Sequence, residues 1–110
     1  MDNDKFVSHF SRGIFRAEEP GDIVTLDFTH PGEFKVYVNG VLEDEGTYSV
    51  QGNEFTWETS LYCRTHYPGS EKATYFWTFE NELLEFNLKG KDKCVPRFDD
   101  IQKYTYKRVE

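Results

Sequence analysis

Apolar and polar residues alternate through most of this chain, and this two-residue period constrains its fold more than any other feature. In the segment 23–29, every second residue from Val24 onward is apolar and the residues between are polar. Successive side chains of a β-strand point to opposite faces, so the pattern predicts a strand with one buried and one solvated face. The alternation recurs in the segments 34–38, 48–50, 55–57, 75–79, 84–88 and 104–106. With an expected first strand at Ile14-Phe15-Arg16, about seven or eight short strands result.

A tight hairpin is predicted at Asn39-Gly40, which separates the Phe34-to-Val38 alternation from Val41. Both central residues of a two-residue type I′ turn need positive φ, and Asn-Gly is the favoured pair for it. A second tight turn is expected at Gly52-Asn53, and a loop is expected from Cys63 to Gly69.

Many short antiparallel strands joined by tight turns leave edges that must be protected, and closure into a barrel removes them. The 110 residues suit one domain, residues 1–110. We therefore predict an all-β fold, a single antiparallel up-and-down barrel. The interior of an eight-stranded barrel is just wide enough for side chains or for one small ligand.

The N-terminal segment has a different period. Phe6 and Phe10 have helical spacing, and Gly13 is a suitable stop. We expect a short helix over 1–12 that covers one mouth of the barrel as a lid.

Charge and hydropathy restrict the partners and the location. The formal net charge is −7 and the basic residues form no cluster, which disfavours nucleic acid as a partner. No segment approaches the length of an apolar membrane-spanning helix, and the N-terminus is acidic where a secretory signal would be basic. We expect a cytoplasmic protein with no membrane span, as a monomer or a homodimer.

Several short motifs from the middle and end of the chain form a set. They are Gly46-Thr47-Tyr48-x-Val50-x-Gly52-Asn53-x-Phe55, Cys63, Tyr75-Phe76-Trp77, Leu84-x-Phe86 and Cys94-x-x-Arg97-x-x-x-Ile101. This set, over roughly residues 23 to 108, resembles small bacterial lipocalin-like (calycin-type) barrel proteins. The resemblance implies an up-and-down barrel with a cavity for apolar molecules, and some relatives are cofactor-free enzymes of natural-product pathways. Gly13-Ile14-Phe15 stands where typical lipocalins have Gly-x-Trp.

Cys63 and Cys94 are the only cysteines, and they flank a predicted hairpin, so they can meet in space. Two alternatives stay open. A disulfide would close a loop of about thirty residues and stabilise the fold by about 3–4 kcal/mol, whereas cytosolic conditions favour two reduced thiols. Cys63 and His66 have the spacing of a zinc-ligand pair, but Cys94 brings no second pair, so no metal is expected.

The candidates for ligand contact are mainly aromatic residues whose position in the strand alternation points them into the barrel. Rings with polar tips can both pack and orient a ligand, although aromatic side chains in a small barrel also form a solid core. Arg97 is a further candidate. We expect it to begin a single helical turn, with Pro96 at the first position, and its guanidinium to stack on an aromatic ring at a barrel end, where a structural role is favoured over ligand recognition. The inward-facing candidates are Tyr48, Trp57, Tyr75, Trp77, Phe86 and Tyr106.

The sequence is compatible with three functions. The leading hypothesis is binding of a small, largely apolar ligand in an aromatic-lined barrel. The alternatives are a cofactor-free cyclase or isomerase that uses the same cavity, and a structural or interaction protein with a filled barrel. The sequence contains no Gly-x-Ser-x-Gly motif for nucleophilic catalysis, the catalytic residues are unknown, and no cofactor is expected.

Overall fold

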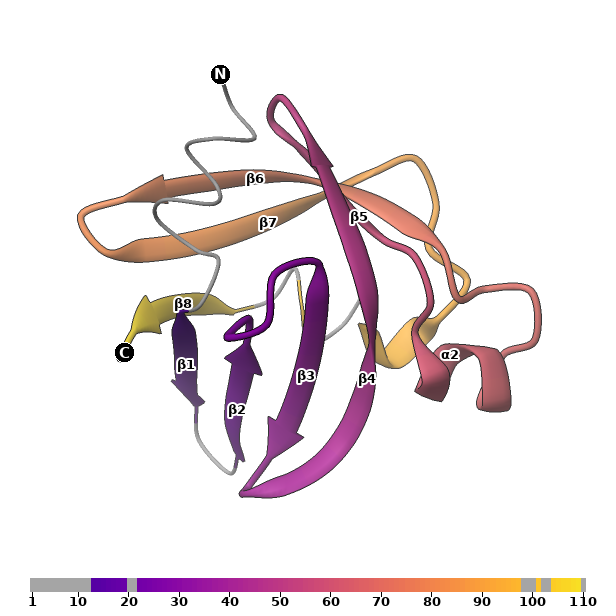
Figure 1. The fold of residues 1–110 in the computed structure, drawn as a ribbon, viewed down its shortest axis with the longest axis horizontal. Coiled ribbons are helices and arrows are strands. Elements are labelled where there is room, and N and C mark those ends of the chain that lie inside the picture. Colours follow the sequence, from indigo (N-terminus) through magenta and orange to yellow (C-terminus); the bar gives the residue numbers. More distant parts are fainter. Residues whose placement is uncertain (1–12, 20–21, 98–100, 102–103, 110) are drawn as a thin grey trace.

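The fold is a closed antiparallel β-barrel (Figure 1). The structure is a computed structural model that describes residues 13–19, 22–97, 101 and 104–109. Each strand of these ranges pairs with the next one along the chain, and β1 pairs with β8 to close the barrel. The predicted up-and-down barrel of about seven or eight strands is thus confirmed, with eight strands in the described part of the chain. The lid helix expected over 1–12 lies outside the described residues.

Two connections are long, the one between β5 and β6, which contains α2, and the one between β7 and β8. The chain is also helical at 95–97 and at Ile101, between the last two strands. In chain order the elements are β1 (Ile14–Glu19), β2 (Asp22–Asp27), β3 (Glu33–Val38), β4 (Val41–Gln51), β5 (Glu54–Trp57), α2 (Leu61–His66), β6 (Ala73–Glu80), β7 (Leu83–Lys89) and β8 (Thr105–Arg108).

The turn between β3 and β4 is the predicted Asn39-Gly40 hairpin. Asn39 has a φ of 52° and Gly40 a φ of 84°, and Val38 pairs with Val41 across the turn. The Asn39 side chain also accepts a hydrogen bond from the backbone N–H of Ile23 at 2.9 Å. Asn39 therefore has two roles: it adopts the positive φ of the turn, and its side chain joins this hairpin to the start of β2.

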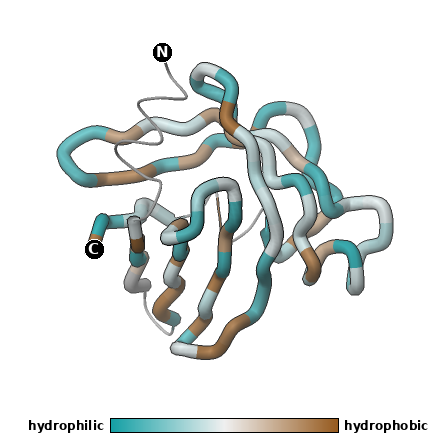
Figure 2. Tube along the Cα trace, viewed as in Figure 1, coloured by the Kyte–Doolittle hydropathy of each residue, from teal (hydrophilic) through white to brown (hydrophobic). Residues whose placement is uncertain are grey.

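Aromatic rings fill much of the barrel interior. Phe55 is fully buried, and its ring centroid lies 4.8 Å from Tyr48, 4.6 Å from Trp57 and 5.2 Å from Phe86. Edge-to-face and offset contacts of this kind add to the stabilisation from burial. Hydrophobic and hydrophilic residues alternate along the strands (Figure 2), as the two-residue period predicts.

One glycine in β4 is required by a close approach of the backbone. A Cβ atom on Gly46 would lie 2.2 Å from the carbonyl oxygen of Thr59, the residue just before the cap of α2. Since that oxygen belongs to the backbone, no rotamer change relieves the clash. Gly46 thus lets the segment between β5 and α2 lie directly against β4.

We expect Gly46→Ala to lower the free energy of unfolding by about 1–3 kcal/mol, the usual cost of overpacking. Ser49→Ala, at an exposed position of the same strand, is the matched control and should change it by less than about 0.5 kcal/mol. Urea denaturation of both variants measures the difference. Equal stabilities would show that β4 and Thr59 can separate freely.

Candidate ligand-binding pocket

A carboxylate of β4 holds the start of α2. Ser60 caps the helix by accepting a hydrogen bond from the Cys63 N–H at 3.1 Å, and its hydroxyl donates to Asp44 Oδ2 at 2.5 Å. Asp44 Oδ1 accepts from the Tyr62 N–H at 2.9 Å. These bonds satisfy N–H groups that the first turn of a helix leaves without partners. The loop expected from Cys63 to Gly69 is therefore wrong for its first part, which is helical to His66.

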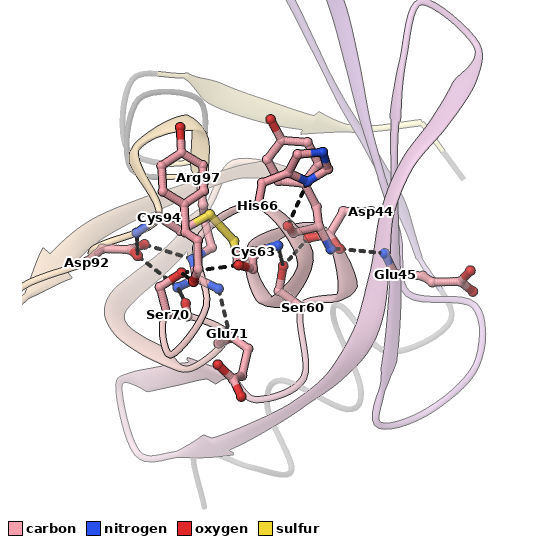
Figure 3. The surroundings of a disulfide bond; sticks show 12 residues. Asp44, Glu45, Ser60, Cys63, His66, Ser70, Glu71, Asp92, Cys94 and Arg97 are labelled. Carbon is pink, nitrogen blue, oxygen red and sulfur yellow. Dashed lines mark hydrogen bonds and ion pairs between the residues drawn. A yellow bond between two sulfur atoms is a disulfide. The ribbon is translucent and has the colours of Figure 1, made fainter.

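A disulfide joins α2 to the segment that follows β7. Cys63 and Cys94 are bonded, with their Cα atoms 5.6 Å apart, and both residues are buried (Figure 3). The bond resolves the two alternatives left open by the sequence in favour of the bridge. It fixes one end of the 94–97 segment against the helix.

Arg97 forms a buried ion pair with Asp92 (Figure 3). Its Nε and Nη2 donate to the two Asp92 oxygens at 2.7 and 2.8 Å. The remaining bonds go to the backbone carbonyls of Ser70 at 2.7 Å and Glu71 at 2.9 Å. The edge of its planar guanidinium is thus engaged by a carboxylate in two-point geometry, and the stacking of Arg97 on an aromatic ring stays a prediction.

Tyr75 belongs to the same cluster. Its hydroxyl donates to Asp92 Oδ2 at 2.5 Å. Burial, and then the hydrogen bond to Asp92, raises the pKa of Tyr75 well above its ordinary value. The phenol is thus held as a neutral donor.

A pocket of about 240 Å³ lies between the barrel and α2. Strands β2 to β5 form its barrel side, and α2 with Pro96, Arg97 and Ile101 forms the other. Its polar side chains are Glu43, Asp44, Tyr62 and Arg97, and the Cys63 half of the disulfide also lines it. Its apolar side chains are Val24, Val36, Val38, Trp57, Pro96 and Ile101.

Two of the seven residues predicted to contact a ligand, Trp57 and Arg97, line this pocket. Trp77 is half-buried, and its indole N–H donates to the Gly52 carbonyl at 3.1 Å. The other four are buried in the core cluster and do not line the pocket: Tyr48, Tyr75, Phe86 and Tyr106.

Sequence reasoning missed the valines and the acidic residues of the pocket. The inward-facing side chains of their strands include Val24, Val36 and Val38, which line the pocket. They were not predicted as ligand contacts because only aromatic residues and Arg97 were considered. Their smaller volume is the signal that could have located the pocket, because a barrel lined with rings is hollow only where the inward residues are small. Asp44 carried no such signal, since its role depends on a contact with α2.

Two of the four polar side chains of the pocket, Asp44 and Arg97, already have partners within the protein. Asp44 accepts hydrogen bonds from Ser60 and Tyr62 and also from the Glu45 N–H at 2.8 Å. Arg97 is paired with Asp92. Within the described ranges, no three or more His, Cys, Asp or Glu residues are placed to hold a metal ion.

No family model, curated protein or solved structure matches the chain. The barrel is compatible with a calycin-like fold, and membership of a lipocalin-like family stays a proposal. The helices of the described part of the chain include none that is long and apolar enough to cross a membrane.

We expect Asp92→Asn to lower the free energy of unfolding by about 3–5 kcal/mol, because it leaves the buried Arg97 charge without a counter-ion. The matched control is the exposed ion pair between Lys89 and Glu54, at 2.6 Å. Glu54→Gln should cost about 1 kcal/mol or less. Chemical denaturation of the two variants compares them, and similar losses would contradict a structural role for the buried pair.

The raised pKa of Tyr75 predicts a pH dependence. Below the ordinary tyrosine value of about 10, Tyr75→Phe should cost about 1–3 kcal/mol, since Asp92 loses a donor. Above that pH the unfolded wild type releases the phenolic proton, whereas the folded protein keeps it. The stability contributed by Tyr75 is therefore lost as the pH rises toward its folded pKa.

The measurement is denaturation of wild type and Tyr75→Phe between pH 8 and pH 11, in about half-unit steps. The stability difference between them should narrow above about pH 10. Other titrating groups are common to both proteins and cancel in the difference. A gap that widens with pH would contradict the direction of the pKa shift.

Proposed function

We propose that this protein binds a small, largely apolar molecule in the pocket between the barrel and α2. The observation that carries the proposal is a pocket of about 240 Å³ with six apolar wall residues in a barrel otherwise filled by aromatic rings. An apolar cavity of about 150 Å³ is large enough for benzene. The space is therefore of a size for a molecule of one or two rings.

The walls of the pocket are held in place without a ligand. The disulfide fixes α2 to Cys94, and the Arg97 cluster fixes the segment 94–97 to the residues that precede β6. A preformed pocket loses little conformational entropy on binding, which favours affinity. The resemblance to lipocalin-like barrels, which enclose apolar molecules, supports the same function.

The enzyme alternative finds less support in the pocket. Proton transfer requires an acid or base that is free to act on a bound substrate. Asp44 already accepts three hydrogen bonds, and Tyr75 donates to Asp92 outside the pocket. Binding without chemistry needs none of these groups to change partners, so it is the function we propose.

Tryptophan emission separates the pocket from the rest of the barrel. Trp57 lines the pocket, whereas Trp77 does not. In the variant Trp77→Phe, an apolar ligand should still change the emission in a saturable manner. In Trp57→Phe, the remaining emission from Trp77 should change little.

Filling the pocket should abolish binding. We expect Val38→Trp, in the pocket wall, to reduce the affinity for apolar ligands at least about tenfold, which corresponds to about 1.4 kcal/mol. Val41→Trp is the matched control, since Val41 is 58% exposed on the other side of the same turn and does not line the pocket. Calorimetric titration with a panel of one- and two-ring compounds measures both. A folded wild type that shows no saturable binding to any of them would contradict the proposed function.

A further inference from the structure

Two neighbouring residues of β4, Glu43 and Asp44, both line the pocket. Successive side chains of a regular strand point to opposite faces, so neighbours do not normally share one. The pairing of β4 with β3 explains the exception. Val36 pairs with Asp44 and Tyr37 with Leu42, which leaves Glu43 as an extra residue without a partner on β3. Such a β-bulge turns a side chain out of the regular alternation, and here it adds a second acidic residue to the pocket wall.

The two acidic residues differ in their partners. The hydroxyl of Ser60 and the backbone N–H groups of Tyr62 and Glu45 donate to Asp44. All three donors are uncharged, so these bonds orient the carboxylate without neutralising it. Glu43 is exposed and has no hydrogen-bond or ion-pair partner among the described residues. It therefore lies where the pocket meets the solvent, and its charge is free to pair with a ligand.

The described wall of the pocket holds no positive charge that offsets these carboxylates. Arg97 is the one basic residue among the described residues of the wall, and its guanidinium forms the ion pair with Asp92. That pair is neutral as a whole, and its side chains are 5% and 0% exposed. The wall thus carries two uncompensated negative charges beside an apolar surface, in a chain of formal net charge −7. Such a pocket repels an anionic ligand and attracts a cationic one.

We propose that the ligand is an organic amine, an apolar body of one or two rings with a protonated amino group that pairs with Glu43. This inference rests on the proposed function of the pocket and names its ligand class. The apolar body contacts the valines and the other apolar residues of the wall, and the ammonium group lies beside the exposed carboxylate. Because the charged group stays in contact with water there, the pairing avoids the large desolvation cost of a buried ion pair.

Three naphthalene probes that differ mainly in the charge of one short substituent test the inference. They are the cation 2-(aminomethyl)naphthalene, the uncharged 2-ethylnaphthalene and the anion 2-naphthylacetate, all used at about pH 7. Calorimetric titration is carried out on the wild type and on Glu43→Gln, which removes the charge and keeps the shape of the side chain. The amine should lose about fivefold in affinity, which is about 1 kcal/mol, the upper range for an exposed charge pair. The hydrocarbon should change by less than about twofold, and the anion should bind the variant more tightly than the wild type.

Glu45→Gln is the matched control, because Glu45 lies two residues further along β4, is exposed and does not line the pocket. It changes the net charge by the same amount as Glu43→Gln, and its bond to Asp44 comes from the backbone, which the substitution keeps. All three affinities should stay within about twofold of the wild type. Equal losses of amine affinity in the two variants would overturn the inference, since the overall charge would then be responsible. Equal losses for amine and hydrocarbon in Glu43→Gln would also overturn it.

Reversal of the charge gives a second test. In Glu43→Lys the amine should lose, and the anion gain, at least as much affinity as in Glu43→Gln. Glu43 is exposed and without a described partner, so both variants should fold, which thermal unfolding checks. An amine affinity equal to that of the wild type would overturn the inference. Binding of the hydrocarbon without the amine would overturn the inference alone, whereas failure of all three probes to bind the wild type would overturn the proposed function itself.

Discussion

The ion pair between Arg97 and Asp92 is the interaction on which the described structure beside the barrel depends. It gathers the carbonyls that precede β6, the carboxylate that follows β7 and the hydroxyl of Tyr75 around one guanidinium. Burying a charge is unfavourable unless its partners are complete and well placed, so these segments must come together as a unit. The adjacent disulfide adds α2 to that unit. The pocket exists because this assembly lies beside the barrel and lines one side of a space that the strands leave open.

The barrel is solid in one region and open in another because the size of its inward side chains changes. Phenylalanine and tyrosine rings contact one another around Phe55, which leaves no room for a ligand there. On β2 and β3 the pocket-facing residues are Val24, Val36 and Val38, whose side chains are smaller than the rings of the core. Trp57 stands at the border, in contact with the core rings and in the wall of the pocket. Core packing and pocket therefore occupy different regions of the described structure.

Patterns among neighbouring residues were sufficient to predict the barrel. The pocket depends on contacts between residues that are distant in the sequence, which such patterns do not reveal. The two-residue period and the Asn39-Gly40 pair are properties of neighbouring residues, so strands and hairpin could be predicted directly. Helix α2 has only six residues, which is too short for a periodic hydrophobic signal. Its start depends on the Ser60 cap and on Asp44, which is distant in the sequence. Asp92 could not be recognised as the partner of Arg97, because an isolated Asp in a Lys-rich turn resembles any solvated residue. The predicted ligand contacts were chosen by ring character, and most of those rings proved to be core.

Trp57 links the wall of the pocket to the stability of the fold, because it belongs to both the pocket lining and the core. The packing that removes its N–H from water is the same packing that orders Phe34, Phe55 and Phe86. Its Nε1 has no acceptor in the described part of the structure, and the aromatic contacts of the core offset the cost of this unpaired donor. The core thus fixes this part of the pocket wall, and a wall that is fixed in advance lowers the entropic cost of accommodating a ligand.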